Sequence, residues 1–549
     1  YTQESLGSRS ASNGSNWTLK TYLTYTNTFG RHQITAMAGH EAQENNWESL
    51  SGTRSDYFLN SVHELDAGSS LTAKNSSSKG SSAIESYFGR VNYGFDDRYL
   101  LTLTVRGDGS STFAPNNRWG IFPSAALAWK LKNEKFLKNV SWLDNLKLRL
   151  GWGLVGNQAA ENYAYGVKMR TVATIWGSGY YAENYGNENL KWEETEAWNA
   201  GLDINLFGNR VELIIDGYYK NTDNLLMKAS LPSYVNGVIS SPWVNAGAMT
   251  NKGLEFTLNT VNINKNDFMW RSGLTISFNR NEITKLYTET AGLSGTINSE
   301  TYTYSEVGQP IGQFYGYNVI GMFTKEDDFY KRDSYGNYIL DKNGVKVAIP
   351  KGKNISESEI WVGDYIYEDI DDNGVIDEKD RTYLGNPEPK FSYGFNNSFS
   401  YKGFDLNIFI NGVYGNKVVN MLRKEFTNPM NNSGMLKEAV NIARVELIDP
   451  SQPTTLSNVY VSNAGSAQVQ RITAANANDN NRMSSRFVED GSYLRIKNIS
   501  LGYTFPKKWI SKLNIDNLRV YMNIQNAFTF TKYKGYDPEV GAYNYDVLT

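Results

Sequence analysis

The sequence of 549 residues contains no cysteine, only 13 prolines and only three histidines. The lack of cysteine excludes disulfide frameworks, thiolate zinc sites and cysteine nucleophiles. His32, His40 and His63 lie early in the chain and do not have the spacing of a metalloprotease zinc helix. A G-x-S-x-G nucleophile elbow does not occur either. We therefore expect a protein that is not an enzyme.

Long hydrophobic runs and an excess of one charge are also missing. No stretch approaches 18 consecutive apolar residues, which excludes transmembrane helices but not a spanning β-barrel, whose strands alternate. The formal net charge is −3, from 54 basic and 57 acidic residues, and no basic stripe occurs. We therefore expect no nucleic-acid partner. The chain is instead rich in aromatic residues, at 13%.

Alternation of apolar and polar residues is the strongest pattern in the chain. Residues 404–411, for example, place Phe, Leu, Ile and Ile at even positions and Asp, Asn, Phe and Asn at odd ones. This period of two is typical of β-strands with one apolar face. The pattern predicts fourteen strands, at 17–25, 33–43, 86–95, 99–106, 122–131, 147–156, 194–207, 210–220, 251–260, 268–279, 391–401, 404–412, 493–504 and 518–527.

The connections between these strands alternate between short and long. Short ones are predicted at 26–32, 96–98, 132–146, 208–209, 261–267, 402–403 and 505–517. Long ones are predicted at 44–85, 107–121, 157–193, 221–250, 280–390 and 413–492, followed by 528–549. Transmembrane barrels have short periplasmic turns and long extracellular loops, so 280–390 and 413–492 are expected to be extracellular. A multi-domain soluble β protein with large insertions is the alternative.

The number and direction of the strands indicate part of a larger barrel. Large outer-membrane transporters have 22 strands around a plugged lumen. Fourteen strands that start toward the periplasm would correspond to the eighth to the twenty-first. We therefore expect residues 1–549 to form an all-β, incomplete antiparallel transmembrane barrel that lacks the plug.

Several segments carry a resemblance to a known family. They are ESYFGRVNYGFDDRYLLTLTVRGDGSSTF (85–113), RWGIFPSAALAWKL (118–131), LKLRLGWGLVGNQ (146–158), NLKWEETEAWNAGLDINLFGNRVELIIDGYYKNTDNLL (189–226), NAGAMTNKGLEFTLN (245–259), NPEPKFSYGFNNSFSYKGFDLNIFINGVYGN (386–416), SRFVEDGSYLRIKNISLGYTFP (485–506) and NLRVYMNIQNAFTFTKYKGYDPEV (517–540). In this order they resemble the barrel of SusC/RagA-type TonB-dependent outer-membrane transporters.

The resemblance implies a function and partners. A transporter of this type takes up oligosaccharides or oligopeptides across the outer membrane, is energised by TonB, and works with a SusD-like surface lipoprotein as its lid. The family's signal peptide, carboxypeptidase-like domain, TonB box, plug and final strand are not recognised in this sequence. A passive porin, a soluble extracellular glycan-binding protein and, more remotely, a glycosidase remain as alternatives.

The segment DIDDNGVIDEKD, residues 369–380, has the spacing of a calcium-binding loop. This spacing would direct hard oxygen ligands to one point around the turn at Gly374. The twelfth position is Asp rather than Glu, which should weaken binding. The predicted ligands are Asp369, Asp371, Asn373, the Val375 carbonyl, Asp377 and Asp380. An acidic turn without an ion is the alternative.

The aromatic residues divide into two sets by position. Those near strand ends suit the girdles at membrane interfaces, and they are Tyr99, Trp129, Trp192, Trp198, Tyr218, Trp270 and Tyr401. Those in the long connection 157–193 could contact a sugar or peptide substrate, and they are Trp176, Tyr180, Tyr181 and Tyr185. Simple packing of the loop is the alternative for the second set.

Overall fold

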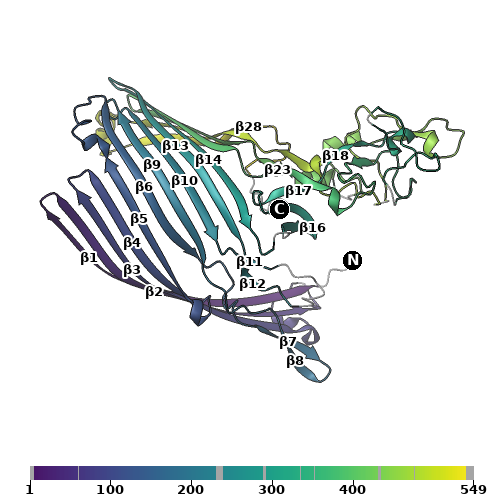
Figure 1. Ribbon diagram of the computed structural model, residues 1–549, viewed down its shortest axis with the longest axis horizontal. Coiled ribbons are helices and arrows are strands. Elements are labelled where there is room, and N and C mark those ends of the chain that lie inside the picture. The colour runs from purple at the N-terminus through teal and green to yellow at the C-terminus, as the bar shows by residue number, and fades with distance from the viewer. Residues whose placement is uncertain are drawn as a thin grey trace. The chain divides into compact units, whose positions relative to one another are not determined.

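The computed structural model describes residues 5–59, 61–229, 239–288, 292–333, 335–350, 353–430, 434–474 and 477–539 (Figure 1). Parts of the predicted connections 44–85, 221–250, 280–390, 413–492 and 528–549 lie outside these residues. In the described part, fourteen strands form one antiparallel sheet in chain order. They are β1 (Leu6–Phe29), β2 (His32–Ser55), β3 (Lys74–Phe95), β4 (Tyr99–Ser110), β5 (Trp119–Lys130), β6 (Leu143–Asn157), β9 (Glu193–Leu206), β10 (Val211–Asp223), β13 (Ala248–Lys265), β14 (Phe268–Lys285), β21 (Phe391–Tyr401), β22 (Phe404–Tyr414), β27 (Tyr493–Thr504) and β28 (Arg519–Thr531).

Each of the fourteen predicted strands is confirmed by one strand of this sheet. The main difference is the length of β1, β2 and β3, which have 22 to 24 residues. β1 begins well before its predicted start, and β2 and β3 extend from both sides into the segment predicted as the connection 44–85. Their extensions are rich in Ser, Asn and Gly, so they carry no apolar alternation. The backbone pairing continues there, as between Ser10 and Ser51, together with side-chain hydrogen bonds such as that between Ser49 and Ser78 at 2.8 Å.

The chain divides into two compact units, residues 1–254 with 284–289 and residues 255–283 with 290–549. The first unit also contains the hairpin β7 (Met169–Thr174) and β8 (Gly177–Ala182), the short pair β11 (Leu226–Lys228) and β12 (Trp243–Asn245), and the 3₁₀ turns 65–67, 70–72, 115–117 and 131–133. A small hydrophobic core in this unit holds the long connections in place. It is formed by Phe113, Phe122, Ala164, Leu190 and Trp192. The girdle prediction for Trp192 is therefore wrong, because this side chain is buried beside two phenylalanines.

In the second unit, the two longest connections fold into structure of their own. We call residues 292–385 and 415–492 the loop module. Its strands are β15 (Gly292–Ile297), β16 (Glu300–Glu306), β17 (Gln313–Tyr317), β18 (Val319–Met322), β19 (Tyr365–Tyr367), β20 (Arg381–Gly385), β23 (Lys417–Val419), β24 (Val445–Leu447), β25 (Val459–Val461) and β26 (Val488–Asp490). Its helical segments are α2 (Met421–Phe426) and the 3₁₀ turns 326–329, 378–380, 437–441, 456–458 and 485–487, while α3 (Lys507–Ile510) and the turn 511–513 lie outside it.

One hydrophobic core joins the two connections of the loop module. The connection after β14 contributes Phe323, Phe329 and residues 360–362, and the connection after β22 contributes Ala443, Val459 and Val461. Phe323 and Phe329 stack with ring centroids 4.1 Å apart. The two connections are thus one folded body. Among the described residues, no helix is long and apolar enough to cross a membrane.

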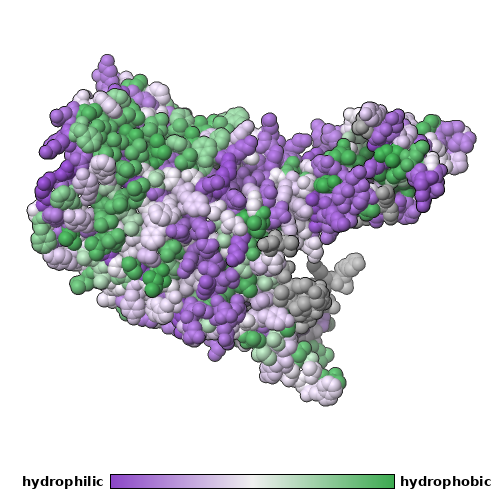
Figure 2. Space-filling model, viewed as in Figure 1, coloured by the Kyte–Doolittle hydropathy of each residue, from purple (hydrophilic) through white to green (hydrophobic). Residues whose placement is uncertain are grey.

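The sheet strands present one apolar and one polar face, as the alternation predicts. On the apolar face, Ile408 lies beside Ile499, which lies beside Ile524. On the polar face, Asn407 lies between Ser398 and Ser500. Figure 2 shows apolar residues gathered over the strands of the large sheet, whereas the surface of the loop module carries many hydrophilic residues. A broad apolar face on exposed strands is what a lipid-facing sheet requires.

On the polar face of the sheet, two ion pairs each join the outer two of three neighbouring strands. Each pair passes over a glycine of the strand between them. Arg149 on β6 reaches Asp216 on β10 at 2.9 Å across Gly201 of β9. Asp405 on β22 reaches Arg519 on β28 at 2.6 Å across Gly502 of β27. A Cβ atom at either glycine would lie less than 3.0 Å from both partners of its ion pair. These glycines therefore make room for the charged side chains.

Gly201→Ala is expected to destabilise the folded protein, because the new methyl group displaces the Arg149–Asp216 pair. Overpacking of this kind costs about 1–3 kcal/mol. Gly151→Ala is the matched control, since a Cβ there would meet Asn199 at an ordinary 3.7 Å. The control should be neutral or stabilising by up to about 1 kcal/mol. The thermal stability of both variants is measured as the temperature at which half of the folded band is lost in SDS gels. Equal temperatures for the two variants would contradict the expectation.

Candidate functional site: the loop module

The acidic loop 369–380 brings three of its predicted ligands together. Asp369, Asp371 and Asp380 each place one carboxylate oxygen within 4.8 Å of the others. Asp380 is fully buried, Asp369 is partly buried and Asp371 is exposed. Gly374 takes a φ of +84°, which provides the predicted chain reversal. Three carboxylate oxygens thus lie close together, which is part of the roughly six to eight oxygen ligands that calcium takes.

Backbone amides already bind several of these oxygens. Asp369 accepts hydrogen bonds from the amides of Asn373 at 3.1 Å and Gly374 at 2.7 Å. Asp380 accepts from the amides of Ile370 and Asp377, both at 2.8 Å. The loop is thus held in its turn by its own carboxylates.

Two further predicted ligands, Asp377 and Asn373, make hydrogen bonds within the loop. The Asp377 carboxylate accepts a hydrogen bond from the amide of Lys379 at 2.8 Å and caps the 3₁₀ turn 378–380. The Asn373 side-chain oxygen accepts from the amide of Val375 at 2.6 Å. Calcium binding stays a prediction.

The four aromatic residues predicted to contact substrate do not form one platform. Trp176 lies at the tip of the β7–β8 hairpin and is 90% exposed. Tyr180 and Tyr181 are successive residues of β8, so their side chains point to opposite faces of the hairpin. Tyr185 follows the hairpin and is partly buried. Their contact with a substrate stays a prediction.

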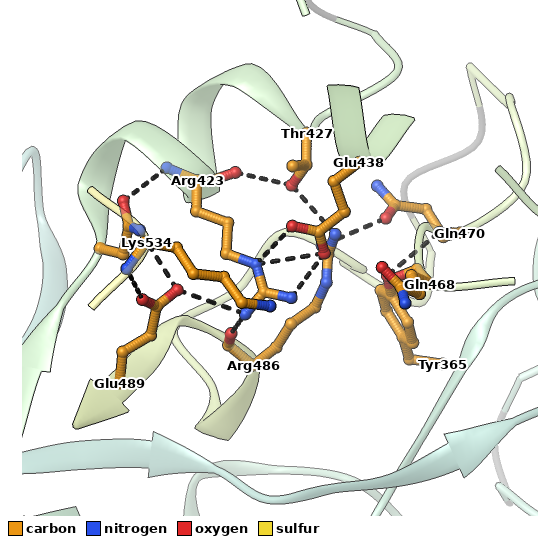
Figure 3. A network of polar contacts seen from close by, with 10 residues as sticks. Tyr365, Arg423, Thr427, Glu438, Gln468, Gln470, Arg486, Glu489 and Lys534 are labelled. Carbon is orange, nitrogen blue, oxygen red and sulfur yellow. Dashed lines mark hydrogen bonds and ion pairs between the residues drawn. The ribbon is translucent and has the colours of Figure 1, made fainter. Parts of the chain in front are cut away.

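A buried charged network lies within the loop module, and the sequence did not reveal it (Figure 3). Arg423 on α2 donates from Nε to both carboxylate oxygens of Glu438, at 2.9 and 3.2 Å. It also lies 3.5 Å from Glu489 on β26 and donates to the backbone oxygen of Arg486 at 2.6 Å. Burial acts to raise the pKa of Glu438, but hydrogen bonding and the charge of Arg423 hold that pKa below its usual value.

Arg486 is the second cation of this network. Its guanidinium lies 4.9 Å above the ring of Tyr365 and donates to the Thr427 hydroxyl at 3.0 Å and to Gln470 Oε1 at 3.4 Å. Burial lowers the pKa of Arg486 and raises the pKa of Tyr365 to about 12. The Tyr365 hydroxyl donates to the backbone oxygen of Gln468 at 2.9 Å. The network thus links β19, α2 and the segment 468–487.

A second buried ion pair joins the two connections directly. Arg471 donates to both oxygens of Asp364, at 2.9 and 3.2 Å, and the side-chain amide of Asn480 donates to the same carboxylate at 3.0 Å. The Arg471 and Asp364 side chains are only 7% and 1% exposed. They lie 107 positions apart in the sequence, so no local motif could have identified them.

Long antiparallel strands with one apolar face, joined to a large folded loop module, are features of outer-membrane β-barrel proteins. Comparison with known families specifies the class. Residues 1–527 match the family described as "TonB dependent receptor-like, beta-barrel". The chain belongs to this family, and it is an outer-membrane protein.

Similar proteins include named receptors and a transporter. The chain is 33% identical over 544 residues to TonB-dependent receptor P3 of Formosa agariphila, covering 97% of this chain and 50% of that protein. It is 32% identical over 535 residues to TonB-dependent receptor SusC of Bacteroides thetaiotaomicron, covering 94% and 47%. The solved structure of the RagAB peptide transporter matches its fold with a TM-score of 0.78 and 23% identity, covering 97% of this chain and 54% of that one. The chain thus spans about half the length of these relatives.

Proposed function

We propose that this chain is the barrel part of a SusC-like, TonB-energised importer of oligosaccharides or oligopeptides. The family match over residues 1–527 carries the proposal. The similarity to TonB-dependent receptor SusC and to the fold of the RagAB peptide transporter supports it. A SusD-like surface lipoprotein is the proposed lid, and TonB is the proposed source of energy.

The loop module is proposed to lie on the extracellular side, where it would meet the substrate and the lid. It belongs to the two longest connections between sheet strands, and long connections of such barrels are extracellular. Its own hydrophobic core and the buried Asp364–Arg471 pair give it the rigidity that a binding surface needs.

The proposal is tested by uptake in the native bacterium. Deletion of the gene for the full-length protein is expected to abolish uptake of one class of labelled oligosaccharide or oligopeptide, and the intact gene should restore it. Collapse of the proton-motive force should stop uptake in the complemented strain. Uptake that persists after this collapse would indicate a passive porin instead, and unchanged uptake after deletion would refute the transport role.

We also propose that the loop 369–380 binds calcium. The convergence of Asp369, Asp371 and Asp380 supports this, and the short twelfth ligand suggests a dissociation constant of about 10⁻⁴–10⁻³ M. Calorimetric titration of the full-length protein should detect this binding, and Asp369→Ala should abolish it. Glu378→Ala is the matched control, because this exposed carboxylate is not a predicted ligand. If the Asp369→Ala variant and the parent bind calcium equally, the calcium site is refuted and the loop is an acidic turn without an ion.

A further inference from the structure

A small cavity of about 230 Å³ lies in the loop module beside the acidic loop. Ligand pockets for drug-sized molecules have about 300–1,000 Å³, whereas a cavity of about 150 Å³ accommodates benzene. The cavity therefore has room for one amino-acid side chain rather than for several sugar rings. Its apolar lining consists mainly of Ile320, Phe323, Ile349, Ile366, Ile376 and Tyr367.

The polar groups of the inner wall are already engaged within the protein. The hydroxyls of Tyr365 and Tyr367 donate to the backbone oxygens of Gln468 and Asp479, at 2.9 and 3.0 Å. The side-chain amide of Asn478 donates to the Tyr365 backbone oxygen and to Asn480. The wall thus presents mainly apolar surface, which suits an aliphatic group better than a sugar, whose hydroxyls would lose hydrogen bonds to water.

The charged residues that line the cavity are mostly acidic. Glu368, Asp369 and Asp372 face one cation, Lys331, which pairs with Asp372. Three carboxylates against one ammonium leave a local charge of −2 at neutral pH. The Asp372 side chain is 77% exposed, so the acidic border is open to solvent on the side of the Asp372–Lys331 pair. An apolar hollow with an acidic border is complementary to an apolar group that lies next to a positive charge.

We propose that this cavity binds the first residue of an oligopeptide, with an aliphatic side chain in the hollow and the α-ammonium group near Asp372 and Glu368. In a free peptide, the amino-terminal residue places a side chain and a positive charge on the same carbon atom. The inference rests on the proposed import function for its biological meaning, because it assigns the peptide as the imported substrate. The binding itself is measured without transport.

The test is a calorimetric titration of the full-length protein in detergent with three peptides: Leu-Gly-Gly, its N-acetyl derivative and Gly-Gly-Gly. The buffer contains EDTA, because Asp369 is also a predicted calcium ligand. Leu-Gly-Gly should bind, and the other two should each bind roughly tenfold more weakly or worse, since each lacks one half of the recognised pair. Equal affinity for all three peptides, or no binding of Leu-Gly-Gly at 10 mM peptide (roughly the weak end of measurable affinity), would overturn the proposal.

Two variants localise the binding. Asp372→Asn should weaken Leu-Gly-Gly roughly tenfold and leave the acetylated peptide unchanged, because it removes one carboxylate charge and leaves Lys331 unpaired beside the ammonium position. Ile320→Trp should abolish binding, because the larger side chain fills the hollow. Ile320 is exposed, so this variant should fold and provides the test even if Asp372→Asn fails to fold. Glu378→Gln, an exposed carboxylate outside the cavity, is the control and should bind normally. Normal binding by the Ile320→Trp variant would overturn the assignment.

The outcomes separate this inference from the proposed function. Uptake of oligosaccharides without binding of Leu-Gly-Gly would overturn the peptide site and leave the importer intact. Conversely, the protein could bind Leu-Gly-Gly in a way that depends on Ile320 and yet support no uptake. This result would support the site and refute the transport role.

Discussion

Replacing Ile408 with arginine is expected to prevent assembly of the protein in the outer membrane, whereas Asn407→Arg should be tolerated. Ile408 belongs to the apolar face, beside Ile499. Asn407 belongs to the opposite face, between Ser398 and Ser500. An arginine on the lipid face costs about 2–4 kcal/mol at the bilayer midplane. Because the two positions are adjacent in the chain, they lie on opposite faces of the sheet at nearly the same depth in the membrane.

The amount of folded, heat-modifiable protein in isolated outer membranes measures this difference. Ile408→Leu is the control for the loss of the branched side chain, and it should assemble normally. Equal assembly of the two arginine variants would mean that the faces of β22 are assigned the wrong way round, or that this part of the sheet does not face lipid.

Glu438→Ala is expected to unfold part of the loop module while the large sheet remains intact. The substitution leaves Arg423 with the more distant Glu489, and it removes the carboxylate charge that favours the charged form of Arg486. Removal of one partner of a buried ion pair costs about 3–5 kcal/mol. Residues 415–492 should therefore become susceptible to limited proteolysis, whereas the heat-modifiable band of the barrel should persist.

Two further variants separate charge from packing at this position. Glu446→Ala, on the exposed face of β24, is the control and should leave the protease resistance unchanged. The double substitution Arg423→Met with Glu438→Leu should recover most of the resistance, because an apolar pair of similar volume can replace a buried ion pair. A Glu438→Ala variant as resistant as the parent would show that Glu489 alone compensates Arg423.

The large sheet could be predicted from the sequence because its signal is local. In β22 the alternation from 404 to 411 needs no information from elsewhere in the chain. The extensions of β1 to β3 could not be predicted, since residues such as Ser51 and Ser76 pair through their backbones without an apolar pattern. A strand that is held by backbone pairing and polar side chains resembles a polar loop in the sequence.

The same distinction separates the parts of the candidate site. The convergence of Asp369, Asp371 and Asp380 was predictable because these residues lie within twelve positions around one turn. The Arg423–Glu438 network was not, because Arg423 lies 15 positions from Glu438 and 63 positions from Arg486, and no local spacing marks them as partners. The four aromatic residues lie close in the sequence, but the pleat of β8 separates Tyr180 from Tyr181.

The glycines beneath the crossing ion pairs also fix the alignment of the strands. If β9 slid by two residues, the space over the strand between Arg149 and Asp216 would receive Asn199 or Asp203 in place of Gly201. The corresponding slip of β27 would bring Ser500 or Thr504 to the place of Gly502. Each of these side chains would fill the space of the bridge, although Asp203 already pairs with Arg149 in the observed alignment. The observed alignment is the one that leaves this space open at both bridges. During assembly, the two glycines therefore favour the strand register that fits both neighbouring strands.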